Sequence, residues 1–179
     1  MRTFGFWGFI ALLVAQVGLG GPRDRGTAHG LDPQLRFTAT PVSASFKQGE
    51  EVSYDFSIEN RGRSSLLVSP LLILNYDIHL KVNDTWGREV AWCGIIAKYV
   101  FLKGQFTTLD PGKTIRARRE ISCDRRHESG FSIVAVGDYS VTATYRFPVP
   151  KEMRDHPGPI PLASGSHVSE QSHFAIVRR

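Results

Sequence analysis

Beyond its first 21 residues, the chain has no long apolar run. The longest candidate, residues 66–74, is interrupted by Ser69 and Pro70. It falls well short of the roughly 18 apolar residues that a membrane-spanning helix needs. We therefore predict no membrane span once the first segment has been removed.

Motifs for catalysis and metal binding are also lacking. Residues 112–114 read Gly-Lys-Thr, but a phosphate-binding loop requires a glycine where this chain has Thr107. His127 and Glu128 resemble the start of a zinc-peptidase helix, but the second histidine is replaced by Phe131. A G-x-S-x-G nucleophile motif is missing as well. We predict a protein that is not an enzyme, with no catalytic residue, no metal and no cofactor.

Charge of one sign is not concentrated enough to indicate nucleic-acid binding. The formal net charge is +5. The densest basic cluster, between Arg116 and Arg126, is interrupted by Glu120 and Asp124 and contains no aromatic residue. A solvated surface is the preferred interpretation of this cluster, and an anion-binding patch is the alternative.

The first 21 residues have the layout of a secretory signal peptide. Arg2 supplies a positive start, residues 4–19 are uncharged and mostly apolar, and Gly20 and Gly21 supply a small-residue cleavage site. The pattern predicts a signal peptide over 1–21 and a secreted or periplasmic protein. An uncleaved signal anchor is the competing interpretation.

Only two cysteines are present, Cys93 and Cys123. In an oxidising compartment, two cysteines most simply form one disulfide. The alternative is a pair of buried free thiols in neighbouring strands.

The remaining sequence reads as short strands separated by turns. Residues 52–59 show the clearest alternation, because Val52, Tyr54, Phe56 and Ile58 share one face and polar residues share the other. Further strands are predicted at 35–40, 66–74, 78–82, 89–92, 106–109, 115–123, 139–146 and 174–176. We predict an all-β chain: a disordered leader over 22–34, then over 35–179 a single antiparallel immunoglobulin-like β-sandwich of about 7–9 strands, with a long loop at 148–170.

Two candidate sites lie near the middle of the chain. Trp86, Trp92 and Tyr99 are candidates for an exposed aromatic platform that binds a sugar or a peptide, although packing is the preferred interpretation. Asn83 begins an Asn-Asp-Thr sequon on a predicted hairpin tip and is a candidate for glycosylation.

A set of spaced motifs resembles a known family. They are Ile-Glu-Asn-Arg-Gly at 58–62, Gly-Arg-Glu-Val at 87–90, Gly94, Phe-Thr-Thr-Leu-Asp-Pro-Gly at 106–112 and Gly-Asp-Tyr-Ser-Val at 137–141. In this order they resemble the non-catalytic N-terminal β-domain, similar to a pro-domain, of deuterolysin-like (aspzincin) zinc metallopeptidases. More generally, the chain is similar to the bacterial intracellular proteinase inhibitor domain. The zinc-binding HExxH helix is absent from this sequence, so no catalytic or metal residue carries over.

Together these features predict a secreted, non-enzymatic module that binds a protein. The resemblance implies a peptidase as the partner, with the chain acting as an inhibitor or chaperone. We expect binding at an exposed strand edge, either the strand interrupted by Pro70 or the final strand around Phe174. The alternative is a module that binds carbohydrate or the cell envelope through the aromatic platform.

Overall fold

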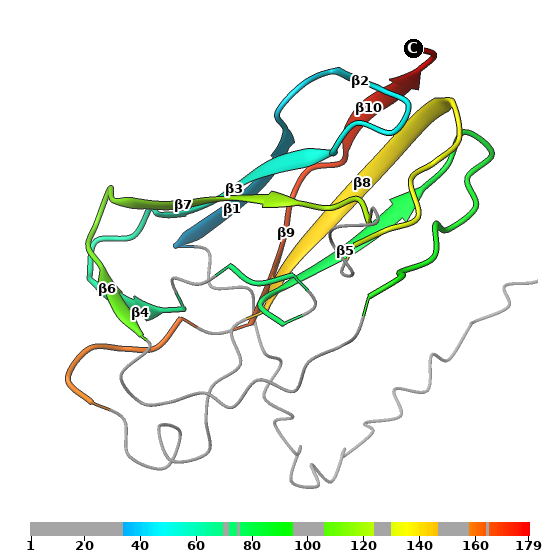
Figure 1. Cartoon of the computed structure of the whole chain (residues 1–179). Coiled ribbons are helices and arrows are strands. Elements are labelled where there is room, and N and C mark those ends of the chain that lie inside the picture. The colour runs from blue at the N-terminus through cyan, green and yellow to red at the C-terminus, as the bar shows by residue number, and fades with distance from the viewer. Residues whose placement is uncertain are drawn as a thin grey trace, which may run out of the picture.

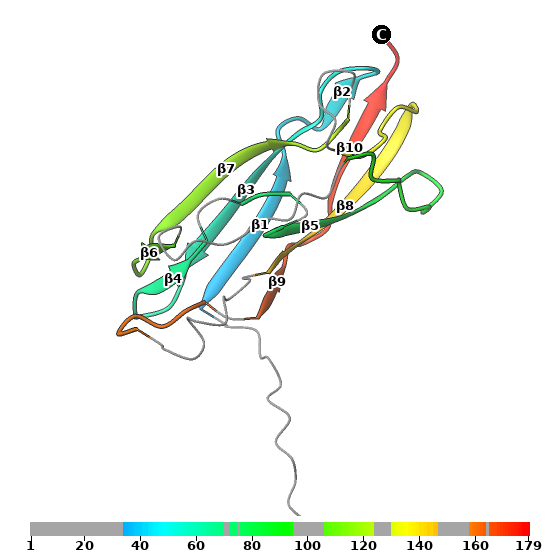
Figure 2. The same cartoon turned by 60° about the horizontal axis from the view of Figure 1, so that its bottom comes forward.

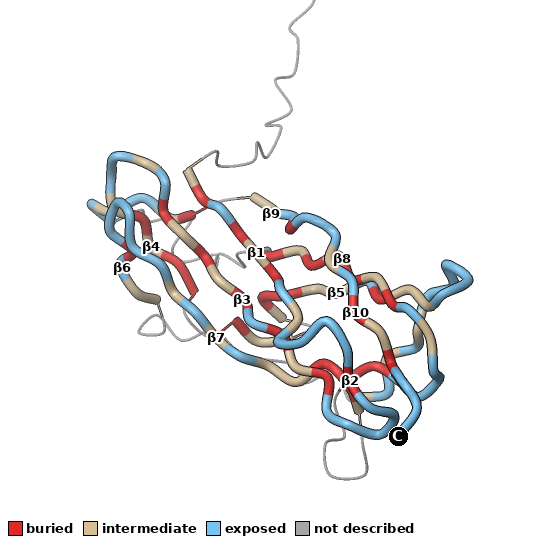
Figure 3. The backbone as a smooth tube through the Cα atoms, turned by 90° about the horizontal axis from the view of Figure 1, so that it is seen from above, coloured by how far each residue is buried: buried red, intermediate tan, exposed pale blue. Residues whose placement is uncertain are grey.

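The structure is a computed structural model that describes residues 34–69, 72–74, 76–94, 106–123, 130–146, 158–163 and 165–179. These residues form ten strands and no helix (Figure 1). The all-β prediction is confirmed, and alternation is its physical cause. Strand β3 (Ser53–Asn60) buries Tyr54, Phe56 and Ile58 completely and leaves the intervening polar residues more exposed. Buried and exposed positions also alternate along β1 in Figure 3.

The first sheet contains three antiparallel strands in the order β1-β3-β7, where β1 is Leu35–Pro41 and β7 is Thr114–Glu120. Strand β3 is central, and β1 and β7 lie on its two sides. Phe37 lies opposite Ile58 in the register, and Ile58 lies opposite Ile115. The same face of all three strands therefore carries the apolar side chains.

The second sheet has the order β2-β10-β8-β5. Its strands are β2 (Ser45–Lys47), β5 (Ile78–Asn83), β8 (Gly137–Arg146) and β10 (Ser172–Val177). The short strand β9 (Ser166–Val168) also pairs with β8. All of these pairings are antiparallel except that of β2 with β10. A separate two-stranded pair joins β4 (Leu66–Val68) to β6 (Thr107–Leu109).

The two larger sheets, whose arrangement is seen in Figure 2, share one core of buried side chains. The ring of Phe37 lies 5.7 Å from that of Tyr145, and the ring of Tyr54 lies 6.1 Å from that of Phe174. Each of these pairs joins one sheet to the other. The strand orders β1-β3-β7 and β5-β8-β10 match those of strands A-B-E and C-F-G in immunoglobulin domains.

The strand boundaries differ from those predicted at several places. Strand β2 was not predicted, and β9 lies inside the predicted loop at 148–170. Each has three residues, which is too short for alternation to be recognised. The predicted strand at 66–74 ends at Val68, and the predicted return at 89–92 forms only isolated bridges at Glu89 and Trp92.

Cys93 and Cys123 form a disulfide with a Cα–Cα distance of 6.6 Å, so the disulfide prediction is confirmed and the free-thiol alternative is wrong. Backbone hydrogen bonds from Cys93 N to Gly130 O and from Cys123 N to Phe131 O lie beside it. The predicted signal peptide and leader fall almost entirely outside the described residues and remain predictions. Where the structure describes the chain, it contains no helix with the length and hydropathy needed to cross a bilayer.

Candidate functional site

Of the predicted aromatic platform, the described residues include one largely exposed ring, that of Trp86. Trp86 is 69% exposed in the loop after β5, and the guanidinium of Arg88 lies 4.6 Å from its ring centroid. Arg88 also forms a 2.8 Å salt bridge with Asp84. Trp92 is only half-exposed and packs edge-on against Phe131 at 5.1 Å, as the packing interpretation predicts. Tyr99 lies outside the described residues.

Asn83, the first residue of the sequon, lies in the second sheet and not at the predicted hairpin tip. Asn83 is the last residue of β5, is half-buried, and lies opposite Ser140 of β8. The hydroxyl of Thr85 accepts a 2.8 Å hydrogen bond from Asp138 N and donates a 3.0 Å one to Asp138 O. The third sequon residue therefore helps to hold the loop against the start of β8.

Both strands proposed from the sequence as binding edges have neighbours on each side over part of their length. Phe174 belongs to β10, which has β2 on one side and β8 on the other. Strand β4 pairs with β6 on one side. On its other side, Leu67 N donates to Pro161 O and Leu67 O accepts from Ala163 N. Partners distant in sequence therefore pair with part of each expected edge, β2 with Ala175–Val177 of β10 and residues 161–163 with Leu67.

The described strands leave another edge open, along β1. Within the described part of the chain, β1 pairs only with β3. Hydrogen bonds from Arg61 N to Gln34 O and from Val42 N to Ser53 O fix which residues face β3. Because bonded positions alternate along an antiparallel pair, the N–H and C=O groups of Leu35, Phe37 and Ala39 point away from β3. Their side chains point into the core and are at most 7% exposed.

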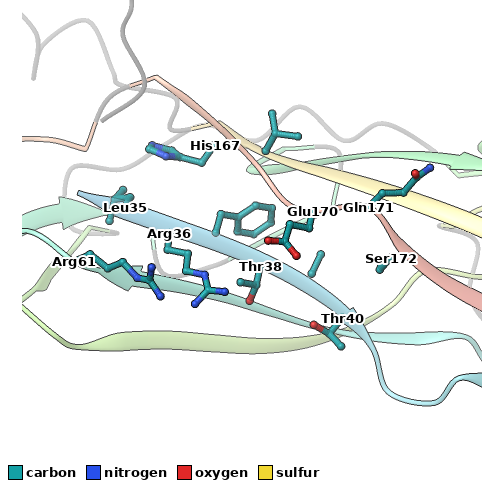
Figure 4. Close-up of a pocket in the computed structure, with 12 residues that line it drawn as sticks. Leu35, Arg36, Thr38, Thr40, Arg61, His167, Glu170, Gln171 and Ser172 are labelled. Atoms are coloured by element: carbon teal, nitrogen blue, oxygen red, sulfur yellow. The ribbon is translucent and has the colours of Figure 1, made fainter. Parts of the chain in front are cut away.

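A groove of about 700 Å³ runs beside this edge (Figure 4). One wall is β1 over residues 35–40, with Arg61 nearby. The other wall is formed by His167, Val168, Glu170, Gln171 and Ser172. Figure 4 shows Arg36 and Arg61 toward one end of the groove and Thr40 toward the other.

The far wall is shaped by a break between β9 and β10. Both strands pair with β8, but the register shifts by one residue between Val168 and Ser172. Ser169 occupies the break: its N–H donates to Ala143 O at 2.8 Å, and its hydroxyl accepts from Ala143 N at 3.1 Å. Such a bulge bends a strand and interrupts its ladder. Glu170 and Gln171 consequently line the groove.

One residue of the far wall, Ser172, makes a hydrogen bond to the other sheet. The hydroxyl of Ser172 donates to the Tyr54 hydroxyl at 3.3 Å. Burial raises the pKa of Tyr54 to about 12, although this hydrogen bond acts in the opposite direction. The phenol is therefore neutral at physiological pH and serves as a polar contact rather than a charge.

The side chain of Asp77 is also buried, between β4 and β5. Its carboxylate accepts hydrogen bonds from the Ser69 hydroxyl at 3.1 Å and from Ile73 N at 3.2 Å. Burial raises the pKa of Asp77 above its ordinary value, despite these hydrogen bonds. The contacts hold the chain between β4 and β5. The described residues contain no group of three or more His, Cys, Asp or Glu side chains arranged to hold a metal.

No protein-family model and no curated protein sequence matches this chain. Sequence reasoning found β1 but not its open side, since alternation reports which face is buried and not which edge is unpaired.

Proposed function

We propose that this protein is a secreted, non-enzymatic module that binds an extended segment of a partner protein along β1. The observation that carries the proposal is the row of backbone groups at Leu35, Phe37 and Ala39, which pair with none of the described strands and lie beside a groove of about 700 Å³. A strand edge with this geometry is the template used in β-strand addition.

Backbone pairing and the groove contribute different parts of the binding. Each net hydrogen bond contributes about 0.5–1.5 kcal/mol, so three residues with two groups each supply affinity without regard to side chains. The groove accepts alternate side chains of the added strand, which supplies selectivity. Pro41 has no N–H and therefore ends the donor row at the C-terminal side.

Export is supported by the disulfide, which persists in oxidising compartments. Together with the signal-like first 21 residues, it favours a secreted or periplasmic protein. The resemblance to peptidase-associated β-domains makes a peptidase the first partner to test.

The proposal is tested by blocking the open edge. In Ala39→Pro the ring replaces an N–H that points away from β3, so the β1–β3 ladder keeps its hydrogen bonds. Thr114→Pro is the matched control, because by the same alternation its N–H points to the opposite edge of the sheet, away from the groove. The oxidised proteins serve as baits for the secreted fraction of the producing organism, and amide exchange is followed on the recovered complexes.

Strand addition predicts a partner that wild type and Thr114→Pro retain and Ala39→Pro loses. That partner should also slow amide exchange at Leu35, Phe37 and Ala39. Equal capture by all three proteins, or protection elsewhere, would reject β1 as the binding edge. Inhibition of a recovered peptidase would support the peptidase-associated role.

A second candidate, sugar binding, is favoured only by the exposed ring of Trp86 and the stacked Arg88. Aromatic rings and adjacent cations commonly form exposed binding surfaces. Soluble glycans should then change tryptophan fluorescence in wild type but not in Trp86→Ala. An unchanged wild-type spectrum counts against this function.

A further inference from the structure

The geometry of β1 also specifies the sequence pattern of its partner, an inference that rests on the proposed strand addition. In an antiparallel pair, residues directly opposite each other point to the same face. Partner residues opposite Leu35, Phe37 and Ala39 therefore point into the groove. Those opposite Arg36, Thr38 and Thr40 point to the outer face.

The inward positions favour apolar side chains. They lie beside the buried side chains of Leu35, Phe37 and Ala39, which point into the core. The Glu170 carboxylate lines the same wall, so an inward acidic residue would meet a like charge. An apolar side chain would instead pack beside these buried residues and gain from leaving water.

The outward position opposite Arg36 favours an acid. Across the ladder, Arg36 lies opposite Glu59, but a Glu59 carboxylate oxygen already accepts a 3.1 Å hydrogen bond from Arg61 Nε. Arg36 and Arg61 both line the groove, so this end carries two cations, and the Glu59 carboxylate is bonded to Arg61. Farther along, the hydroxyls of Thr38 and Ser57 bond to each other at 2.6 Å and present an uncharged surface.

We propose that the partner segment is an antiparallel strand of about seven residues. Apolar side chains occupy its inward positions, and an aspartate or glutamate faces Arg36. The acid completes a charge pair on the outer face, while the apolar residues fill the groove between the two sheets. The selected partner is thus an extended segment with one acid at a defined register, rather than any hydrophobic strand.

The probe is the fluorescein-labelled peptide Thr-Val-Thr-Val-Glu-Val-Thr, whose glutamate faces Arg36 when the fourth residue faces Phe37. A second peptide carries lysine in place of glutamate. Opposite-charge pairs across a ladder are favourable by up to about 1 kcal/mol and like charges are unfavourable. We therefore expect the lysine peptide to bind about fivefold more weakly in fluorescence polarisation.

The register is tested with N-methylated peptides. Methylation of the fourth residue removes a donor that faces Phe37 and should weaken binding about tenfold, through one lost hydrogen bond and a steric block. Methylation of the third residue alters an N–H that points away from β1 and should leave affinity within about twofold.

Charge reversal tests the assigned residue from the protein side. Arg36→Glu should invert the preference, so that the lysine peptide binds more tightly than the glutamate peptide. Arg63→Glu is the matched control: Arg63 is exposed and does not line the groove, so the original preference should persist.

The outcomes separate the two proposals. If both peptides bind equally and Ala39→Pro abolishes binding, the acidic register is wrong and strand addition stands. If no peptide binds, or if binding survives Ala39→Pro, strand addition at β1 is itself overturned. A dimer of the chain that Ala39→Pro dissociates would make a second copy the occupant and would also reject the acidic segment.

Discussion

Removal of the Cys93–Cys123 disulfide by the double substitution Cys93→Ala and Cys123→Ala should lower the free energy of unfolding by about 3–4 kcal/mol. The bridge joins residues separated by 30 positions. In the chain-entropy model, a loop of this length loses about 12 cal/mol/K of conformational entropy in the unfolded state, which gives this value near room temperature. Typical domains have only about 5–15 kcal/mol of stability, so the loss would be large but survivable.

The folded contacts around the bridge should persist in the double variant. Trp92 still packs against Phe131, and Cys93 N and Cys123 N make backbone hydrogen bonds that do not depend on sulfur. The effect should therefore arise mainly in the unfolded ensemble, which becomes more expanded. This predicts a larger denaturant dependence, the m-value, alongside the lower stability.

Urea unfolding followed by tryptophan fluorescence and far-ultraviolet circular dichroism measures both quantities. Wild type under reducing conditions serves as a second comparison, because it lacks the bond but keeps both thiols. A stability loss below about 1 kcal/mol would refute the chain-entropy reasoning. A loss of the expected size with an unchanged m-value would instead locate the effect in the folded state.

Three further changes probe the core, a close backbone approach and the buried acid. Phe56→Ala should cost about 3–5 kcal/mol in urea unfolding, since Phe56 is fully buried between the rings of Phe37 and Tyr54; a cost below about 1 kcal/mol would contradict this packing. Gly130→Ala should cost about 1–3 kcal/mol, because the new Cβ would lie 2.5 Å from the Ser122 carbonyl carbon. Gly158→Ala is its matched control, with nothing within 4 Å of the new Cβ, and equal costs would discount the close approach. Because the pKa of Asp77 is raised in the folded state, its contribution is greatest when it is protonated and declines as pH rises from its ordinary pKa of 3.8 through its folded pKa. The stability of Asp77→Asn relative to wild type should therefore increase across that window in urea titrations at several pH values, and a parallel pair of curves would refute the linkage.

Local pattern was sufficient to predict the strands with several alternating residues. The period of two in 52–59 and 139–146 places every second side chain in the core, and β3 and β8 follow it closely. The short strands were not predicted, because they are too short to show alternation. β2 and β9 each bury a single residue, Phe46 and His167, and one buried position has no period.

The candidate site depended on information that local pattern does not hold. Trp86 was recognised as a candidate, but the neighbouring loop and strands decide that it is exposed while Trp92 packs against Phe131. The pairing of the two predicted edges also depends on the tertiary structure. The strand of Phe174 and that of Leu67 pair with residues far away in the chain, so no nearby residue signals their pairing.

The sequence by itself determined the all-β class, because alternating apolar residues bury one face of a strand wherever that strand pairs. It also determined the pairing of Cys93 with Cys123 once oxidation is granted, because no third cysteine competes. Only the tertiary structure decided that, among the described strands, β1 has one edge without a neighbour beside a groove. That outcome depends on the crossing of the chain from β1 to β2 and on the one-residue bulge before β10, both of which are set by contacts between residues distant in sequence.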